Sequence, residues 1–271
     1  MIKLIVSDLD GTLIPEGSQQ IEQGFIEVLS ELLDRGYLFY AASGRQYANM
    51  YRKFGEYSER MGFICENGSL AMEKGERKYI EEIPRDKMRE IANDIMSFPE
   101  TDILLSGVKS CYIKPRTKWY ENQIMNVIKN DSIIFENPDE IDDQIIKISM
   151  YIYDFPKNAN KVRAFFSEKY GDYADFVDGG NSWIDMIPKG SGKGKALRAI
   201  LDIKGIALDE IMVFGDNQND ISMLELTKNS YAVEHAKPDV KMCAGNTCIS
   251  VTACLKEFLK KESYDGYAGK D

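Results

Sequence analysis

Histidine, cysteine pairs and long apolar runs are scarce in this chain, and each shortage narrows the class of protein. His235 is the only histidine, and because nothing in the sequence places a partner beside it, we expect it to be structural. The five cysteines are odd in number and form no C-x-x-C pair, which predicts buried, reduced thiols. No stretch approaches the roughly 18 consecutive apolar residues of a membrane span, and no apolar signal core opens the chain. We therefore expect a cytoplasmic protein with no membrane partner.

Positive charge is also in deficit. The chain has 34 Lys and Arg residues against 44 Asp and Glu residues, which gives a net charge of −10. Such an acidic chain predicts no nucleic-acid partner, and it would need local positive charge or a metal ion to handle an anionic substrate. Its 271 residues, 44% hydrophobic and 29% charged, suffice for one large domain or two moderate ones.

An apolar, β-branched run opens the chain and ends in acidic residues. Residues 2–7 (IKLIVS) are typical of a buried strand, and Asp8, Asp10, Gly11 and Thr12 follow it. If the strand continues through the acids, its period of two points Asp8 and Asp10 the same way. The two carboxylates would then share one small space and repel, unless a cation lies between them or one carries a proton. Gly11 allows the chain to turn sharply after them.

Strands and helices alternate after this run, as in a parallel α/β sheet. Apolar residues at helical spacing between Ile21 and Leu33 precede a predicted strand over 37–42, so a right-handed crossover should make the two strands parallel. The other predicted elements are a helix over 46–54, a strand over 63–65, a hairpin over 69–83, a helix over 195–203, strands over 211–214 and 230–233, a short helix after Pro238 and an amphipathic helix over 252–262. We predict an α/β fold with a Rossmann-like parallel-sheet core formed by residues 1–83 and 189–271.

The pattern changes between residues 84 and 188. The elements predicted here are helices over 86–97, 117–129 and 158–169, and strands over 102–106, 109–114, 132–136, 144–153, 173–177 and 183–187. Helices mixed with short antiparallel strands predict a separate α+β unit. Because the pattern of the core resumes afterwards, we interpret residues 84–188 as an inserted domain.

Polar residues follow three of the predicted parallel strands and open one helix. They are Asp8 and Asp10, Ser43, Lys193, and Asp216, Asn219 and Asp220. The carboxyl ends of parallel strands meet at one edge of a sheet, so we expect these residues to come together. Carboxylates can bind Mg²⁺, while a hydroxyl and a lysine supply donors for a phosphate. The residues therefore predict a magnesium–phosphate site with a carboxylate available as nucleophile.

These segments carry a family resemblance. In order, residues 8–12 (DLDGT), Ser43, residues 193–197 (KGKAL) and residues 215–220 (GDNQND) resemble the four motifs of the haloacid dehalogenase superfamily. More narrowly, the chain is similar to the Cof-type phosphatases, whose α/β cap is inserted between the second and third motifs. Three further segments fit that subfamily: residues 42–45 (ASGR), 66–68 (ENG) and 188–190 (PKG).

The resemblance implies a role for each matching residue. Asp8 would attack phosphorus and form an aspartyl-phosphate, and Asp10 would protonate the leaving alcohol and then activate the hydrolytic water. Mg²⁺ would be held by the carboxylate of Asp8, the backbone carbonyl of Asp10 and Asp216. The residues that would bind the phosphoryl oxygens are Ser43, Lys193 and Asn219. The supporting residues would be Thr12, Gly44, Arg45 and Asp220, and Asp220 would orient either Lys193 or the water on the metal.

The implied activity is that of a Mg²⁺-dependent phosphomonoesterase. Its substrate would be a small phosphorylated metabolite, such as a sugar phosphate or a phosphorylated cofactor. The inserted unit would be a cap that selects this substrate. A phosphomutase with the same aspartyl-phosphate is an alternative, and so is a non-catalytic phospho-Asp sensor, although Asp10 favours turnover. Lys189 and Lys195 compete with Lys193 for its role. Arg45 fits a surface ion pair as well as a substrate contact, and Asn67 fits a turn as well as a site.

Overall fold

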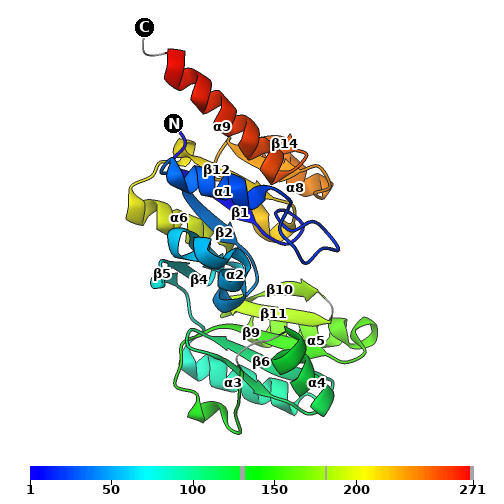
Figure 1. The fold of residues 1–271 in the computed structure, drawn as a ribbon. Coiled ribbons are helices and arrows are strands. Elements are labelled where there is room, and N and C mark those ends of the chain that lie inside the picture. The colour runs from blue at the N-terminus through cyan, green and yellow to red at the C-terminus, as the bar shows by residue number, and fades with distance from the viewer. Residues whose placement is uncertain (129–131, 181, 269–271) are drawn as a thin grey trace. The chain divides into compact units, whose positions relative to one another are not determined.

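A computed structural model describes residues 1–128, 132–180 and 182–268 (Figure 1). The chain divides into two compact units: unit 1 is Met1–Tyr79 with Gly192–Asp271, and unit 2 is Ile80–Ser191. The predicted fold class, α/β with a Rossmann-like parallel-sheet core, is confirmed.

Unit 1 is built on an eight-stranded sheet whose order is β14-β13-β12-β1-β2-β3-β4-β5. The strands are β1 (Leu4–Asp8), β2 (Leu38–Ala42), β3 (Gly62–Cys65), β4 (Leu70–Glu73), β5 (Glu76–Ile80), β12 (Ile211–Gly215), β13 (Ser230–Val233) and β14 (Asn246–Cys248). The strands from β14 to β3 pair in parallel, and β4 is antiparallel to β3. β1 is entirely buried between β12 and β2, so the residues that follow these three strands emerge at one edge of the sheet.

The helices of unit 1 follow the apolar periodicity of the sequence. They are α1 (Phe25–Asp34), α2 (Tyr47–Phe54), α6 (Lys193–Lys204), α7 (Ile221–Leu224), α8 (Pro238–Cys243) and α9 (Val251–Ala268). In α1, Phe25, Val28, Leu29 and Leu32 are buried, which is the 3–4 spacing of one helical face. α6 ends at Lys204 and is capped by Gly205, whose left-handed backbone lets its N–H bond back to the carbonyls of the last turn.

Unit 2 has a six-stranded sheet of order β10-β11-β9-β6-β7-β8. The strands are β6 (Thr101–Gly107), β7 (Cys111–Lys114), β8 (Ser132–Ile134), β9 (Ile145–Ile152), β10 (Ala174–Gly180) and β11 (Trp183–Pro188), and the helices are α3 (Arg85–Ser97), α4 (Lys118–Asn122) and α5 (Phe155–Tyr170). One apolar core joins the sheet to α3 and α5 through residues such as Ile91, Ile148 and Phe166. A smaller cluster contains Tyr120 of α4, with Tyr151 and Trp183 packed against it.

Three local features differ from the sequence predictions. The strands of unit 2 are not all antiparallel, because β7 and β8 pair in parallel across the α4 crossover. α4 passes into a π-helix at Gln123–Ile128, and residue 129, the last of the predicted helix, lies outside the described residues. The prediction ended the sheet with the strand over 230–233, but β14 adds a further parallel strand beside β13.

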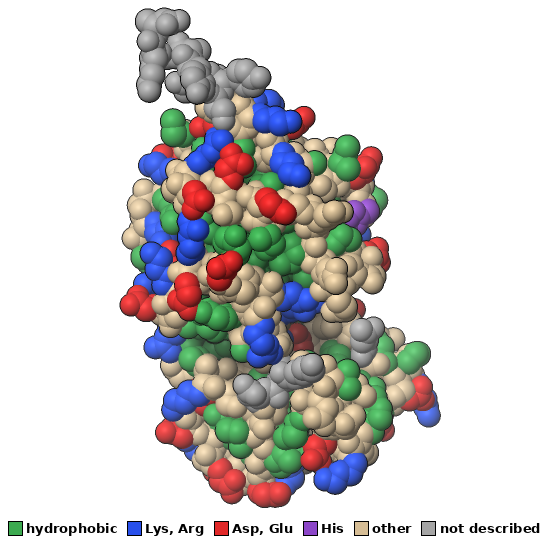
Figure 2. Space-filling view, in the orientation of Figure 1, with side chains coloured by type: hydrophobic (Ala, Val, Ile, Leu, Met, Phe, Trp, Pro, Cys, Tyr) green, Lys and Arg blue, Asp and Glu red, His purple; other side chains and the backbone are tan. Residues whose placement is uncertain are grey.

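The surface carries charges of both signs. Figure 2 shows Lys and Arg side chains interspersed with Asp and Glu side chains on the face in view. None of the helices that the structure describes is long and apolar enough to cross a membrane.

Candidate active site

Asp8 is the last residue of β1 and is only 5% exposed. It pairs in register with Ala42, the last residue of β2, so Ser43 follows at the same edge. On the other side of β1, Ser7 pairs with Phe214, and Asp216 follows the end of β12. The parallel register therefore brings three segments distant in sequence to the carboxyl edge of the sheet, where ligands bind in open α/β sheets.

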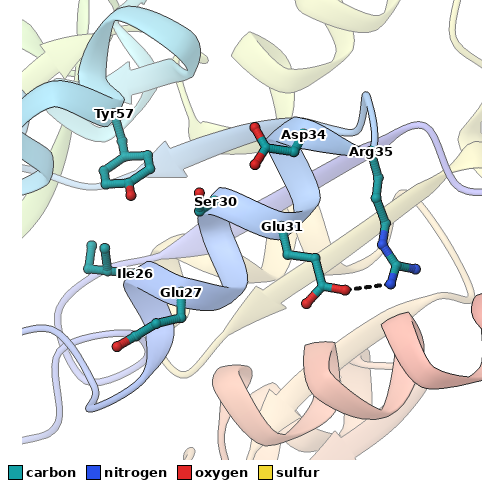
Figure 3. Close-up of a pocket in the computed structure, with 7 residues that line it drawn as sticks. All are labelled: Ile26, Glu27, Ser30, Glu31, Asp34, Arg35 and Tyr57. Atoms are coloured by element: carbon teal, nitrogen blue, oxygen red, sulfur yellow. Dashed lines mark hydrogen bonds and ion pairs between the residues drawn. The ribbon is translucent and has the colours of Figure 1, made fainter.

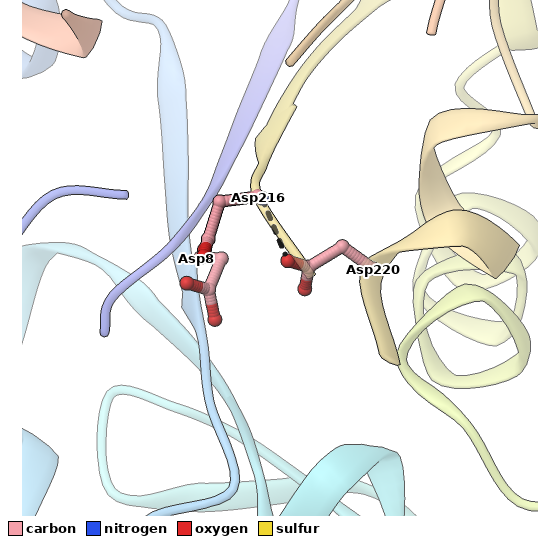
Figure 4. A group of neighbouring side chains, drawn as sticks. All are labelled: Asp8, Asp216 and Asp220. Atoms are coloured by element: carbon pink, nitrogen blue, oxygen red, sulfur yellow. Dashed lines mark hydrogen bonds between the residues drawn. The ribbon is translucent and has the colours of Figure 1, made fainter. Parts of the chain in front are cut away.

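Three carboxylates gather at this edge (Figure 4). Each of Asp8, Asp216 and Asp220 offers an oxygen, and these oxygens lie within 4.8 Å of one another. Burial, and then the charge of Asp220, raises the pKa of Asp8 well above its usual range, against the opposing charge of Lys193. Burial also raises the pKa of Asp216, although the hydrogen bond from Thr12 works in the other direction.

Lys193 lies among these acids with no exposed surface. Its Nζ donates to Asp8 Oδ1 and, at 2.6 Å, to Asp220 Oδ1. Burial works to lower the pKa of Lys193, but the charges of Asp220 and Asp8 outweigh it and raise the pKa, so the ammonium is retained. Of the two competing lysines, Lys189 pairs with Asp175 in unit 2, and the side chain of Lys195 is exposed.

Asp220 uses both carboxylate oxygens within the protein. Oδ1 accepts from Lys193, and Oδ2 accepts from the backbone N–H groups of Asp216 and Asn217, each at 3.0 Å. The second oxygen thus caps the short turn at Gln218–Asp220. With both oxygens engaged, Asp220 is a support for Lys193 and for the Asp216 loop rather than an open ligand.

Asp8 and Asp216 offer the more open oxygens. Asp8 Oδ2 is buried and has no hydrogen-bond partner among the described residues. Asp216 Oδ1 accepts from Thr12 Oγ1 at 2.7 Å, and Oδ2 lies where a side chain at Gly11 would collide with it. A buried, unsatisfied carboxylate oxygen is costly unless a cation or a proton compensates it. The three carboxylates outnumber the one ammonium, and the oxygens of Asp8 and Asp216 are donors that suit a hard divalent cation.

Asp10 has different hydrogen-bond partners from Asp8, because the condition that the strand continues through both acids is not met. β1 ends at Asp8, and the Leu9 carbonyl then accepts the N–H groups of Leu13 at 2.9 Å and Ile14 at 2.7 Å, which closes a turn. The side chain of Asp10 is consequently 48% exposed.

The partners of Asp10 come from the loop after β2. Arg45 donates from Nε to Asp10 Oδ2 at 2.8 Å and from Nη2 to Oδ1 at 2.6 Å, and Ser43 Oγ donates to Oδ2 at 3.2 Å. Burial works to raise the pKa of Asp10, but the hydrogen bonds and charge of Arg45, with the bond from Ser43, hold it below its usual value. Of the two predicted alternatives for Arg45, the structure has an ion pair, and its partner is a candidate site residue.

Asn219, Gly44 and Asn67 form a third group at the same edge. Asn219 Nδ2 donates to Asn67 Oδ1 at 3.0 Å, and a Cβ on Gly44 would lie 3.0 Å from that same oxygen. The structure therefore places the predicted site residues in three groups at this edge: the buried acids and Thr12 around Lys193, Asp10 and Ser43 with Arg45, and Asn219 and Gly44 with Asn67.

His235 contacts the turn after Asp10, although the sequence placed no partner near it. Its Nε2 lies 2.5 Å from the carbonyl oxygen of Gly11. Because a carbonyl can only accept, Nε2 must carry the proton in this contact. The ring thus holds the turn that follows Asp10. The sequence gave no signal for this role, because residues 11 and 235 are brought together only by the fold.

A surface pocket of about 550 Å³ elsewhere on unit 1 has a different character (Figure 3). It is lined by one side of α1 and by Tyr57, and none of the predicted site residues contributes to it. Its walls carry the carboxylates of Glu27, Glu31 and Asp34 and the guanidinium of Arg35, which is ion-paired with Glu31. This excess of negative charge is unfavourable for a phosphorylated ligand.

Comparisons with known proteins identify the family of the chain. A family model described as haloacid dehalogenase-like hydrolase matches residues 5–253. The chain is 28% identical over 267 residues to a 5-amino-6-(5-phospho-D-ribitylamino)uracil phosphatase of Escherichia coli, covering 97% of this chain and 98% of the relative. A phosphatase of the same name from Bacillus subtilis is 21% identical, covering 94% of this chain and 97% of the relative. A solved structure from Eubacterium rectale has a TM-score of 0.85 at 27% identity, covering 95% of this chain and 99% of that one.

The match of the family model over most of the chain decides the class. The chain belongs to the haloacid dehalogenase-like hydrolases, and within that superfamily it is a phosphatase.

Proposed function

We propose that the protein is a Mg²⁺-dependent phosphomonoesterase that hydrolyses a small phosphorylated metabolite, a sugar phosphate or a phosphorylated cofactor, through an aspartyl-phosphate on Asp8. The observation that carries the proposal is the buried carboxylate of Asp8, with one oxygen bound by Lys193 and the other without a hydrogen-bond partner among the described residues. The names of the two phosphatase relatives, which act on a phosphorylated ribitylaminouracil, support a small-molecule substrate.

The first half-reaction transfers the phosphoryl group to the protein. A carboxylate oxygen of Asp8 forms a bond to phosphorus while the bond from phosphorus to the ester oxygen breaks. Asp10 gives its proton to that oxygen, and the alcohol leaves. The carboxyl group of Asp10 is exposed enough to reach a leaving group outside the buried cluster.

The second half-reaction restores Asp8. Asp10, now a carboxylate, takes a proton from a water molecule whose oxygen attacks the phosphorus of the aspartyl-phosphate. The bond between phosphorus and the Asp8 oxygen breaks, and inorganic phosphate is released. Arg45 favours this half of the cycle, because its hydrogen bonds stabilise the carboxylate form of Asp10.

Ser43, Lys193 and Asn219 are the proposed ligands of the phosphoryl oxygens. Lys193 brings a positive charge that is buried away from solvent, and Ser43 and Asn219 bring neutral donors from two further segments. Mg²⁺, held by Asp8, Asp216 and the backbone carbonyl of Asp10, would neutralise phosphoryl charge when bound. Unit 2 (Ile80–Ser191) is the proposed cap that selects the leaving group.

A panel of phosphomonoesters, assayed for phosphate release and for isomerised product, tests the proposal. We expect stoichiometric release, loss of activity with EDTA and recovery with Mg²⁺. Asp8→Asn should abolish hydrolysis of p-nitrophenyl phosphate without lowering the unfolding temperature, whereas Asp202→Asn, an exposed acid on α6, should not affect it. Isomerisation with little release would identify a mutase, and turnover by Asp8→Asn or without metal would contradict the mechanism.

A further inference from the structure

The turn between β3 and β4, at Glu66–Gly68, has an unusual backbone. All three residues have positive φ angles: 50° for Glu66, 56° for Asn67 and 99° for Gly68. The left-handed region is unfavourable for residues with a Cβ, although asparagine tolerates it better than most. Two consecutive non-glycine residues there persist only where the surroundings enforce the conformation, and such strain concentrates at functional sites.

The surroundings of this turn are the proposed phosphate ligands. The N–H of Asn67 donates to the carbonyl of Ser43 at 3.1 Å, and Asn67 Oδ1 accepts from Asn219 Nδ2 at 3.0 Å. A Cβ on Gly68 would collide with the backbone of Gly192 and with the N–H of Lys193, so the turn packs directly against the start of α6. One three-residue turn thus touches Ser43, Asn219 and the segment that carries Lys193.

The hairpin alone does not require these contacts. β3 and β4 pair up to Cys65 and Leu70, and many loop sequences can connect two antiparallel strands at that spacing. The side chain of Asn67 is nevertheless only 6% exposed, lies against Gly44 and meets a side chain 152 positions away. A buried amide held by a residue of another motif indicates a role beyond turning the chain.

We propose that Asn67 is a positioning residue that fixes the amide of Asn219 and the loop of Ser43 in the orientation that binds phosphoryl oxygens. This inference rests on the proposed phosphatase function of the same site. Asn67 acts through its two neighbours: the backbone N–H holds one ligand segment, and the side-chain oxygen orients the other.

The test separates the side chain from the strained backbone. Asn67→Gly keeps a residue that adopts positive φ freely, so relief of the left-handed strain should offset part of the lost hydrogen bond, and the unfolding temperature should change little. The variant loses the acceptor for Asn219, so we expect a roughly 3- to 10-fold higher KM for p-nitrophenyl phosphate and a matching weakening of inorganic phosphate binding in calorimetry. Lys74→Gly is the matched control, because exposed Lys74 has a φ of 51° in the next turn, and it should change neither quantity.

A double-mutant cycle with Asn219→Ala tests whether Asn67 acts through Asn219. If Asn67 acts through Asn219, the combined variant should bind phosphate no more weakly than the weaker single variant. Additive losses, or an Asn67→Gly variant with wild-type KM and phosphate affinity, would overturn the inference. Failure of the proposed function would look different, because the wild-type protein itself would release no phosphate.

Discussion

Asp8 and Asp10 lie two positions apart, yet their pKa values shift in opposite directions. Burial and the charge of Asp220 raise the pKa of Asp8, whereas Arg45 lowers the pKa of Asp10 against the effect of burial. The first half-reaction needs the reverse, an ionised Asp8 and a protonated Asp10. A cation beside Asp8 would lower its pKa, and separation of Arg45 from Asp10 would let the pKa of that acid rise. Substrate and metal binding should therefore complete the protonation pattern of the site.

Arg45→Ala tests this coupling through the pH dependence of kcat/KM. Without the guanidinium, the pKa of Asp10 should rise, so the acid keeps its proton to higher pH. The alkaline limb of the pH profile, where a general acid is lost, should move to higher pH. Arg60→Ala, which removes an exposed ion pair with Asp34 on α1, is the control and should leave both limbs in place. An unmoved alkaline limb in Arg45→Ala would separate Arg45 from the protonation of Asp10.

At the scale of elements, the turn after β1 sets the geometry of the site. Gly11 has a φ of 88°, and its missing side chain leaves space for the carboxylate of Asp216. His235 holds the carbonyl of the same residue. The turn thus connects Asp10 to the strand end that carries Asp216.

Gly11→Ala should therefore harm both the backbone and the metal ligands. The left-handed backbone costs roughly 1–2 kcal/mol for a residue with a Cβ, and the new methyl group would displace Asp216. We expect a lower unfolding temperature and a rise of about 10-fold or more in the Mg²⁺ concentration for half-maximal activity.

Gly36→Ala provides the matched control for this substitution. Gly36 has the same φ of 88°, but a Cβ there would meet no atom within 4 Å. The control should lose stability without changing the Mg²⁺ requirement. Equal Mg²⁺ curves for the two variants would contradict a role for Gly11 in placing Asp216.

Most helices and strands could be predicted from local sequence patterns. The predictions failed for elements that are defined by pairing between segments distant in the sequence. The β-branched run of β1 and the apolar spacing of α1 depend on nearby residues, and both were predictable. β14 is three residues long and has no apolar period, so only its pairing with β13 defines it. The parallel pairing of β7 with β8 likewise depends on where α4 crosses.

At the candidate site, too, local motifs were predictable and contacts between distant residues were not. The order of motifs supports the grouping of Asp8, Ser43, Lys193 and Asp216, whose roles stay predictions. The bond between Asn67 and Asn219 spans 152 positions, and the bond between His235 and Gly11 spans 224. Such contacts leave no periodic or compositional signal, so no pattern in a single sequence could have named them.

At the scale of the whole molecule, each unit has its own sheet, and unit 2 has its own core. Phe166 is fully buried in the core of unit 2 and stacks with Tyr170 at a ring distance of 6.1 Å, while its neighbour Phe165 is 41% exposed. Replacing each of the two adjacent phenylalanines by alanine therefore compares the loss of a buried ring with the loss of an exposed one.

Phe166→Ala should destabilise unit 2 by about 3–5 kcal/mol through the cavity that it leaves. Hydrogen exchange should accelerate in β6, β9 and β11 and stay slow in β1 and β12, because these two groups of strands belong to different units. Phe165→Ala should have a much smaller effect on the same amides. Equal acceleration in β1 and β12 would mean that the two units unfold as one.

The sheet order also bears on biosynthesis. β1 pairs with β12, more than 200 positions later, and every residue of unit 2 is translated between them. A nascent chain emerging from the ribosome must therefore keep one side of its first strand unpaired until the second segment of unit 1 appears, while unit 2 is continuous and can complete its own sheet earlier. Until then the exposed edge of β1 can pair with strands of other chains. A chaperone that shields the first 79 residues should therefore raise the yield of active protein more than one that acts on unit 2.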